Sequence, residues 1–356
     1  MQAILEQYRA QIVAATEAKS PLRLRGGGSK DWYGDERAGA VLDTRAYSGV
    51  VDYEPTELVI TARCGTPLAD IEALLARHGQ MLAFEPPRHG EASTIGGVVA
   101  AGLSGPRRAS AGAVRDFVLG AKLVNGKGEL LNFGGQVMKN VAGYDVSRLL
   151  AGSMGTLGLI AEVSLKVLPL PVREATLRFA MDEIEALRRL NQWAGRPLPL
   201  SASCWLGGVL YLRLSGAEAA VTAAVAGLGA EAGGVAVGEE DAAVFWSRLR
   251  DQANVWFEGG ALWRLSVPPA ASAIILRGEQ LIEWGGAQRW LKADTADTAS
   301  AADIRRAVAA AGGHATLYRG DKRAGVFHPM APAVARINQR LKQAFDPAGI
   351  FNPTRT

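Results

Sequence analysis

The chain has 356 residues, enough for two domains, and its 48% hydrophobic and 21% charged residues are typical of a globular protein, which excludes disordered and fibrous classes. Its net charge of +4 is small, and its lysines and arginines are scattered among acidic residues, so we expect no nucleic-acid partner. The two cysteines, Cys64 and Cys204, lie far apart without a C-x-x-C pair, which argues against iron–sulfur and structural zinc sites within this chain.

A helix, a strand and a glycine loop are predicted in that order at the start of the chain. Apolar residues recur at helical spacing over residues 3–19, and Pro21 ends this helix. The segment carries charges and lacks the apolar core of a secretory signal, so we expect a cytoplasmic location. Residues 22–24 are predicted to form a strand that leads into the loop R-G-G-G-S-K at positions 25–30.

The rest of the chain is predicted to alternate strands and helices as far as a proline-rich boundary. Strands are expected at 41–43, 58–62 and 159–167, a helix at 67–77, and a hairpin with an Asn-Gly turn at 117–133. The sequence L-P-L-P at 168–171 marks the boundary, because prolines stop strands. Beyond this boundary the sequence predicts a second domain, because helices such as 182–193 and a concentration of tryptophans follow there. A final helix, 331–345, leads into a turn-rich tail.

Three glycine-dense segments carry the strongest functional signal. They lie at 25–30, at 94–105 and at 152–158. Successive glycines let backbone N–H groups converge on an anion and let the chain approach it closely. Neither the G-x-G-x-x-G nor the Walker spacing is present, which disfavours nicotinamide and nucleoside-triphosphatase sites. Three such loops separated by apolar segments favour a pocket for a phosphate-bearing cofactor over a set of surface turns.

Six segments together resemble the FAD-binding domain of the vanillyl-alcohol oxidase and p-cresol methylhydroxylase flavoproteins. They are R-G-G-G-S (25–29), E-P-T-E-L-V-I-T-A-R-C-G-T-P-L (54–68), T-I-G-G-V-V-A-A-G-L-S-G (94–105), R-D-F-V-L-G (115–120), G-S-M-G-T-L-G-L-I-A-E (152–162) and F-D-P-A-G-I-F-N-P (345–353). Further segments at 134–150, 262–268, 283–291 and 313–321 are similar to the FAD-binding subunit of bacterial glycolate oxidase. The resemblance thus covers most of the chain.

This resemblance implies an α+β fold in which two subdomains hold FAD beneath an α+β cap domain. Residues 1–170, completed by 331–356, would form the two-subdomain FAD-binding domain, and 171–330 the cap or substrate domain. By position, the residues expected to bind FAD are Arg25, Gly26, Gly27, Gly28, Ser29 and Lys30 at the pyrophosphate, Thr94, Ile95, Gly96, Gly97, Gly102, Leu103, Ser104 and Gly105 on the ribityl and flavin side, Gly158 and Ile160 at the adenosine end, and Asn352 near the ring. Ser29 and Lys30 stand where several relatives carry a tethering histidine, so we expect non-covalent FAD, with His89 as the less favoured tether.

Candidate catalytic residues lie in the second domain. A flavin dehydrogenase needs a cation that binds the substrate carboxylate and a base that accepts the hydroxyl proton. His314 and His328 are candidates for the base, and Arg264, Arg289 and Arg319 for the cation. Catalytic relatives carry a histidine-rich metal-binding cluster here, whereas this segment holds two histidines, so we expect no metal. For each candidate, a purely structural role is the alternative.

The resemblance implies an FAD-dependent oxidoreductase acting on CH–OH groups, as the FAD-binding subunit of a complex that oxidises glycolate to glyoxylate. The expected partners are a small 2-hydroxy acid, a second flavoprotein subunit and an iron–sulfur subunit, with the inner face of the membrane reached only through these subunits. The missing histidine cluster favours a supporting or electron-relay role for this chain. A non-catalytic flavin-bearing scaffold and a stand-alone oxidoreductase of another small hydroxy acid or alcohol remain as alternatives. Lys139, Asn140, Tyr144 and Asp145 are candidates for a partner surface or for the flavin edge.

Overall fold

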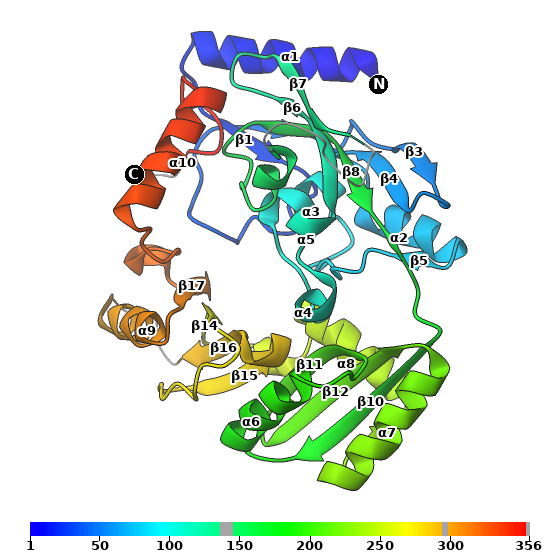
Figure 1. The fold of residues 1–356 in the computed structure, drawn as a ribbon. Helices are drawn as coiled ribbons and strands as arrows, with labels where there is room; N and C mark the ends of the chain where they lie inside the picture. Colours follow the sequence, from blue (N-terminus) through cyan, green and yellow to red (C-terminus); the bar gives the residue numbers. More distant parts are fainter. Residues whose placement is uncertain (136–144, 294–297, 354–356) are drawn as a thin grey trace. The chain divides into compact units, whose positions relative to one another are not determined.

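The computed structural model describes residues 1–135, 145–293 and 298–353 (Figure 1). Lys139, Asn140 and Tyr144 lie outside the described residues. The chain forms two compact units: unit 1 comprises Met1–Ser104, Gly112–Leu170 and Met330–Thr356, and unit 2 comprises Gly105–Ala111 and Pro171–Pro329. The roles expected for the two parts, FAD binding and capping, stay predictions.

Unit 1 contains a five-stranded antiparallel sheet in the order β3-β4-β8-β6-β7. Its strands are β3 (Val50–Glu54), β4 (Val59–Arg63), β6 (Val118–Val124), β7 (Leu130–Gly134) and β8 (Leu159–Lys166). The predicted hairpin is β6–β7, in which Val124 pairs with Leu130 around the Asn-Gly turn. Alternation predicts a half-buried β8, but the structure buries most of this strand on both faces because it lies at the centre of the sheet.

Short strand pairs and helices complete unit 1. The strands are β1 (Leu22–Arg25) parallel to β2 (Ala40–Asp43) and β5 (Gln80–Met81) antiparallel to β9 (Leu168–Pro169). The helices are α1 (Gln2–Glu17), α2 (Leu68–Arg77), α3 (Ile95–Ala101), α5 (Val114–Phe117), the 3-10 turn η1 (Ser147–Leu150) and α10 (Pro332–Phe345). Asp145 accepts a hydrogen bond from Ser147 and pairs with Arg148, both at η1.

The N-terminal helix and the C-terminal tail share one hydrophobic core in unit 1. Leu5, Tyr8 and Ile12 lie at helical spacing on α1 and pack in the same cluster as Leu22 and Phe351. Leu22 and Phe351 also form a parallel β-bridge, so the tail continues the β1 pairing. The tail therefore lies directly beside the strand that enters the first glycine loop.

Unit 2 is built on an eight-stranded antiparallel sheet in the order β13-β10-β12-β11-β15-β16-β14-β17. Its strands are β10 (Arg173–Ala180), β11 (Leu200–Leu206), β12 (Val209–Gly216), β13 (Val235–Val237), β14 (Ala261–Ser266), β15 (Glu279–Glu283), β16 (Gln288–Ala293) and β17 (His314–Arg319). The helices and turns are α4 (Arg108–Ala111), α6 (Glu183–Ala194), α7 (Glu218–Ala232), α8 (Glu239–Asp251), η2 (Val255–Phe257), η3 (Trp284–Gly286), α9 (Thr298–Ala310) and η4 (Lys322–Ala324). The sequence patterns predicted α6 but not this sheet.

Two apolar clusters hold the helices of unit 2 onto the sheet. In one, Leu190 and Trp193 of α6 and Leu228 of α7 pack with strands β10 and β12. In the other, Ile304 of α9 packs with Trp263 of β14. The tryptophans concentrated in this part of the chain thus serve the cores: Trp193 and Trp263 are both fully buried.

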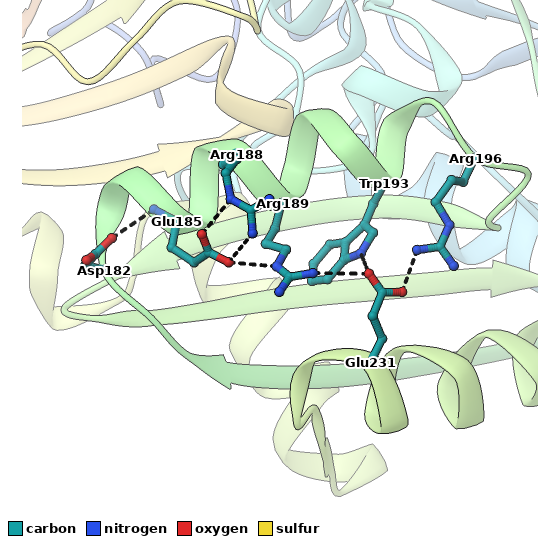
Figure 2. A network of polar contacts seen from close by, with 7 residues as sticks. All are labelled: Asp182, Glu185, Arg188, Arg189, Trp193, Arg196 and Glu231. Carbon is teal, nitrogen blue, oxygen red and sulfur yellow. Dashed lines mark hydrogen bonds and ion pairs between the residues drawn. The ribbon is translucent and has the colours of Figure 1, made fainter.

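A polar network joins α6 to α7 (Figure 2). Asp182 caps α6 by accepting a hydrogen bond from the Glu185 backbone N–H at 2.8 Å. The carboxylate of Glu185 binds Arg188 and Arg189, and that of Glu231 on α7 binds Arg189, Arg196 and the Trp193 indole, which links the two helices. Hydrogen bonds from Arg188 and Arg189 lower the pKa of Glu185 to about 2. The carboxylates of Glu185 and Glu231 are thus each bound by two guanidinium groups.

Candidate functional site

A pocket in unit 1 gathers most of the residues that the sequence predicted for the cofactor. The predicted residues that line it are Arg25, Gly26, Gly27, Gly28, Ser29, Lys30, Thr94, Gly96, Gly97, Gly158, Ile160 and Asn352. The residues that sequence reasoning missed are Arg23, Leu24, Asp31, Tyr33, Arg37, Thr44, Cys64, Ala100, Ala101, Met154, Gly155 and Leu159. Arg23 was foreseeable, since it stands two residues before Arg25 on β1 and strand alternation places both on one face. No local pattern indicated Arg37.

The first glycine loop lies against the segment at 92–94, and this approach requires glycine. A Cβ on Gly26 would meet Thr94 Oγ1, and one on Gly27 would overlap the backbone carbonyl of Ala92. Gly28 has φ +73°, a left-handed conformation that favours glycine. Among the described residues, the N–H groups of Gly26, Gly27 and Gly28 donate no hydrogen bond to another backbone group. The loop thus presents backbone donors at the pocket wall.

Positive charge exceeds negative charge around the pocket. Counting only the described part of the chain, four cationic side chains line it, Arg23, Arg25, Lys30 and Arg37, against one carboxylate, Asp31. Asp31 binds Arg25 Nε at 2.6 Å and lies 4.0 Å from Arg23. Burial lowers the pKa of Arg37, because it outweighs the charges of Asp35 and Asp31, which raise it. A pocket with this surplus favours an anionic ligand.

Thr94, at the entry to α3, holds a buried polar atom that lacks a partner. The residue is only 4% exposed and its Oγ1 is buried, yet this atom forms no hydrogen bond with the described residues. Buried hydroxyls nearly always have a partner, and leaving one unpaired costs about 1–3 kcal/mol. Gly96 allows α3 to approach β4, because a Cβ there would contact Cys64 at 2.6 Å. An acceptor or donor on a ligand in the pocket would satisfy Thr94.

Another part of the lining comes from the third glycine segment and the C-terminal tail. The Asn352 side chain accepts a hydrogen bond from Leu24 N–H at 2.8 Å and donates one to Met154 O at 2.7 Å. Gly158 has φ +148°, and a Cβ there would lie 2.6 Å from Val124 O. Glycine is therefore required for the turn between Gly155 and β8.

Five predicted cofactor residues do not line this pocket. Ile95 is fully buried in the core, and Gly102 ends α3 in a left-handed conformation with φ +67°. Leu103 is buried, and Ser104 Oγ accepts a hydrogen bond from Val114 N–H at 3.0 Å. Gly105 belongs to unit 2, where its carbonyl accepts a hydrogen bond from the Trp284 indole at 3.0 Å. Contact between these five and a cofactor stays a prediction.

The candidate catalytic residues lie at one edge of the unit 2 sheet. His314 begins β17, next to Ser266 of β14, and His328 Nδ1 accepts a hydrogen bond from Ala315 N–H at 3.4 Å. Burial, the charge of Arg264 and that of His328 lower the pKa of His314. The structure therefore brings His314, His328 and Arg264 into one electrostatic neighbourhood.

Two further cationic candidates are engaged elsewhere. Arg319, at the far end of β17, donates hydrogen bonds to Gln252 Oε1 at 2.7 Å and to Phe257 O at 3.5 Å. Arg289 is fully buried and donates to backbone carbonyls, including that of Ser272 at 2.7 Å. Arg289 thus holds a loop in place, and the catalytic assignments of the other candidates stay predictions.

The described residues contain no cluster of three or more histidine, cysteine, aspartate or glutamate side chains suited to a metal ion. Within the same residues, no helix has the length and apolar character needed to cross a membrane. His89, the less favoured tether, lies against Trp32 with ring centroids 5.2 Å apart and does not line the pocket.

Comparison with known proteins identifies the family. Residues 5–134 match a family model described as an FAD binding domain. Glycolate oxidase subunit GlcE of Escherichia coli is 49% identical over 99% of this chain and 96% of its own length. The chain belongs to the glycolate oxidase subunit GlcE family. This membership confirms the resemblance seen in the sequence and, with the domain match, the predicted cofactor, FAD.

More distant relatives of this GlcE family member match about half of the chain. Glycolate oxidase subunit GlcD of Bacillus subtilis is 31% identical over 49% of this chain and 37% of its own length. D-lactate dehydrogenase of Archaeoglobus fulgidus is 31% identical over 46% of this chain and 37% of its own length. These relatives are oxidoreductases of 2-hydroxy acids by name.

Solved structures confirm the predicted fold class. Alkyldihydroxyacetonephosphate synthase gives a TM-score of 0.69 at 14% identity, covering 98% of this chain and 74% of that chain. A second crystal form of that enzyme gives 0.67 at 15% identity, covering 98% and 75%. At such identities the likeness shows the fold alone, an α+β flavoprotein fold of the vanillyl-alcohol oxidase type.

The pocket residues fit FAD. The diphosphate is an anion, and the lining offers a surplus of cations. It also offers the N–H groups of Gly26, Gly27 and Gly28, which donate to no backbone group in the described part of the chain. The unpartnered Thr94 hydroxyl supplies a further group for the ligand. Glycine at 26 and 27 lets the loop pack against Thr94 and Ala92, which places its backbone at the pocket wall, where a linked diphosphate would bind.

Proposed function

We propose that this chain is the FAD-carrying subunit of a glycolate oxidase complex, in which glycolate is oxidised to glyoxylate and the electrons leave through the flavin to a partner subunit. The observation that carries the proposal is the glycine loop at 26–28, which lines a cation-rich pocket and whose N–H groups donate to no backbone group of the described residues. The names of the relatives support the substrate class and membership of a complex. A second flavoprotein subunit and an iron–sulfur subunit are the proposed partners.

Within this proposal, the loop at 26–29 binds the diphosphate through backbone N–H groups, and Arg25 balances its charge. Bound FAD supplies a two-electron acceptor for the Cα–H of the substrate. His314 is the proposed base, because its lowered pKa keeps the imidazole neutral near pH 7 and ready to accept the hydroxyl proton. Arg264 lies near His314 and is the proposed partner of the substrate carboxylate. Arg319 and His328 remain candidates that hold β17 in place through hydrogen bonds to Gln252 and Ala315.

The purified chain tests the proposal directly. We expect a yellow protein with stoichiometric FAD that is released by denaturation, as non-covalent binding requires. Addition of glycolate or D-lactate without oxygen then separates the roles: bleaching by the chain alone supports catalysis here, whereas bleaching that requires the partner subunits supports an electron-carrying role or the scaffold alternative. A colourless protein that does not take up FAD contradicts the proposal.

Arg25→Glu tests the loop itself. The new carboxylate would repel the diphosphate, so we expect the variant to lose FAD during purification. Arg336→Glu, an equal charge change at an exposed position of α10, is the matched control and should keep FAD. Stoichiometric FAD in Arg25→Glu would show that the diphosphate binds elsewhere.

A further inference from the structure

Asn352 connects two walls of the pocket. Its Oδ1 accepts a hydrogen bond from the N–H of Leu24 on β1, and its Nδ2 donates one to the carbonyl of Met154. The residue is 5% exposed, and its own N–H donates to Leu22 O at 2.8 Å. The acceptor of this side chain and one of its two donor hydrogens are therefore used on the protein backbone.

Met154 is held in a conformation that its side chain disfavours. Its φ is +55°, in the left-handed region, which is uncommon for a residue other than glycine. Its N–H donates to Ala100 O of α3 at 2.8 Å, and its carbonyl accepts hydrogen bonds from Asn352 and from Arg37 Nη1. Such backbone strain persists where the surrounding structure over-determines it, and here it shapes a pocket wall.

The tail that carries Asn352 is itself firmly anchored. The Asp346 carboxylate has no exposed surface and accepts hydrogen bonds from Ile350 N–H at 3.1 Å and Phe351 N–H at 2.8 Å. Lys342 of α10 pairs with Asp346 and also donates to Thr156 O at 2.7 Å and Phe351 O at 2.9 Å. The tail and the turn at 154–156 are thus joined at two separate points.

Buried apolar residues wall the part of the pocket that follows the turn at 154–158. Leu159 and Ile160 line it and are 3% and 4% exposed. The ring of a flavin that reacts with a hydroxy acid must be reachable by that substrate. A buried apolar wall suits the half of FAD that does not react, its adenosine, while the proposed function assigns the diphosphate to the glycine loop.

We propose that Asn352 is a positioning residue for the adenosine half of FAD, which acts by holding the Met154 wall and does not touch the flavin ring. This inference rests on the proposed function. It replaces the ring contact that the resemblance implied for Asn352 and predicts that the residue governs affinity for any adenine nucleotide with a diphosphate. Without the Asn352 donor, Met154 O keeps its hydrogen bond from Arg37 but the wall loses its tie to the C-terminal tail. Binding of adenosine must then also re-order the wall, which lowers the affinity.

The test compares two probes, FAD and ADP, on the protein freed of its flavin. In Asn352→Ala we expect the affinity for FAD and the affinity for ADP to fall by the same factor, about tenfold or more. The factor is the same because ADP has the adenosine and diphosphate of FAD but lacks the flavin ring, which Asn352 does not contact in this proposal. The visible absorption spectrum of the remaining FAD complex should match that of the wild type. Asn338→Ala removes an exposed asparagine of α10 that bonds Met330 and Val334, and as the matched control it should change neither affinity.

Asn352→Asp keeps the acceptor for Leu24 N–H but sets a carboxylate against Met154 O, so it should weaken both probes at least as much; this variant serves if Asn352→Ala does not fold. Loss of FAD affinity with unchanged ADP affinity, or a shifted flavin spectrum, would show a ring contact and overturn the proposal. Unchanged affinity for both probes would overturn it as well. Wild-type protein that binds neither probe contradicts the proposed function instead.

Discussion

The pocket of unit 1 and the polar network on α6 and α7 of unit 2 use charge in opposite ways. In the network, the carboxylates of Glu185 and Glu231 are each bound by guanidinium groups, and the arrangement is complete without a ligand (Figure 2). In the pocket, cations exceed carboxylates among the described residues, and Thr94 Oγ1 has no partner. A network in which opposite charges balance has a structural role. A surplus of positive charge beside N–H groups that donate to no backbone group of the described residues indicates a site for an anionic ligand.

Backbone geometry shows the same contrast. The pocket is lined by glycines whose Cβ atoms would overlap neighbouring backbone, as at Gly27, and by Met154 with its positive φ. The network stands on two regular helices, and Gly227 of α7 has open space around it. Substitutions in the two regions should therefore affect different quantities: cofactor binding in unit 1 and, weakly, stability in unit 2.

The largest effect is expected for Gly27→Ala. The new Cβ would overlap Ala92 O, a backbone atom that cannot move without displacing the loop, so FAD affinity should fall about 100-fold, as measured by flavin content and titration. Gly227→Ala is the matched control: in an exposed helix interior it should raise stability by about 0.5–1 kcal/mol and leave FAD unchanged. If Gly27→Ala kept its full FAD content, glycine in the pocket loop would not be needed for FAD binding, and the contrast between the pocket and the α6–α7 network would fail.

The next largest effect is expected for Asp346→Ala, which tests the anchor behind the pocket. The change leaves Lys342 and the N–H groups of Ile350 and Phe351 without their buried acceptor, so unfolding free energy should fall by about 3 kcal/mol in a urea titration. A loss within experimental error would mean that the tail is held by Phe351 and its apolar neighbours alone.

A smaller, pH-dependent effect is expected at Glu174 in unit 2. Burial alone would raise the pKa of this carboxyl, but the charges of Arg107 and Arg213 and a hydrogen bond from Ser215 outweigh it and lower the pKa below 4.5. The stabilisation is present above pH 4.5, where the unfolded chain is also ionised, and is lost as the pH falls through the folded pKa. Urea titrations between pH 3 and 6 should show a shallower acid-side decline for Glu174→Gln; identical slopes contradict this assignment.

The smallest effect is expected for Glu231→Gln in the network of Figure 2. Exposed ion pairs contribute little, so the unfolding temperature should change by about 2 °C or less, with FAD content and activity unchanged. Thermal unfolding followed by circular dichroism measures the shift. A loss of FAD in this variant would show that the network does more than join α6 to α7.

The sequence predicted those site residues whose role is indicated by their immediate neighbours in the chain. The loop at 25–30, the segment at 94–97 and the positions Gly158 and Ile160 were all predicted, and all but Ile95 line the pocket. It also placed Gly102 to Gly105 at the cofactor, which stays a prediction, because these residues do not line the pocket and in the structure end α3 and lead into unit 2. Glycines that end a helix and glycines that bind an anion look alike in sequence, because both supply positive φ or close approach.

By itself, the sequence determined the family, the cofactor class and the local elements, because glycine spacing, turn residues and helical periodicity act over a few residues. The tertiary structure alone decided that Asn352 bonds Leu24, 328 residues away, and that Arg37 bonds Met154. It also decided that β11 pairs with β15 in the unit 2 sheet. Such contacts depend on which surfaces pack together, and strand pairing and side-chain partners over long separations follow from burial and register across the whole chain.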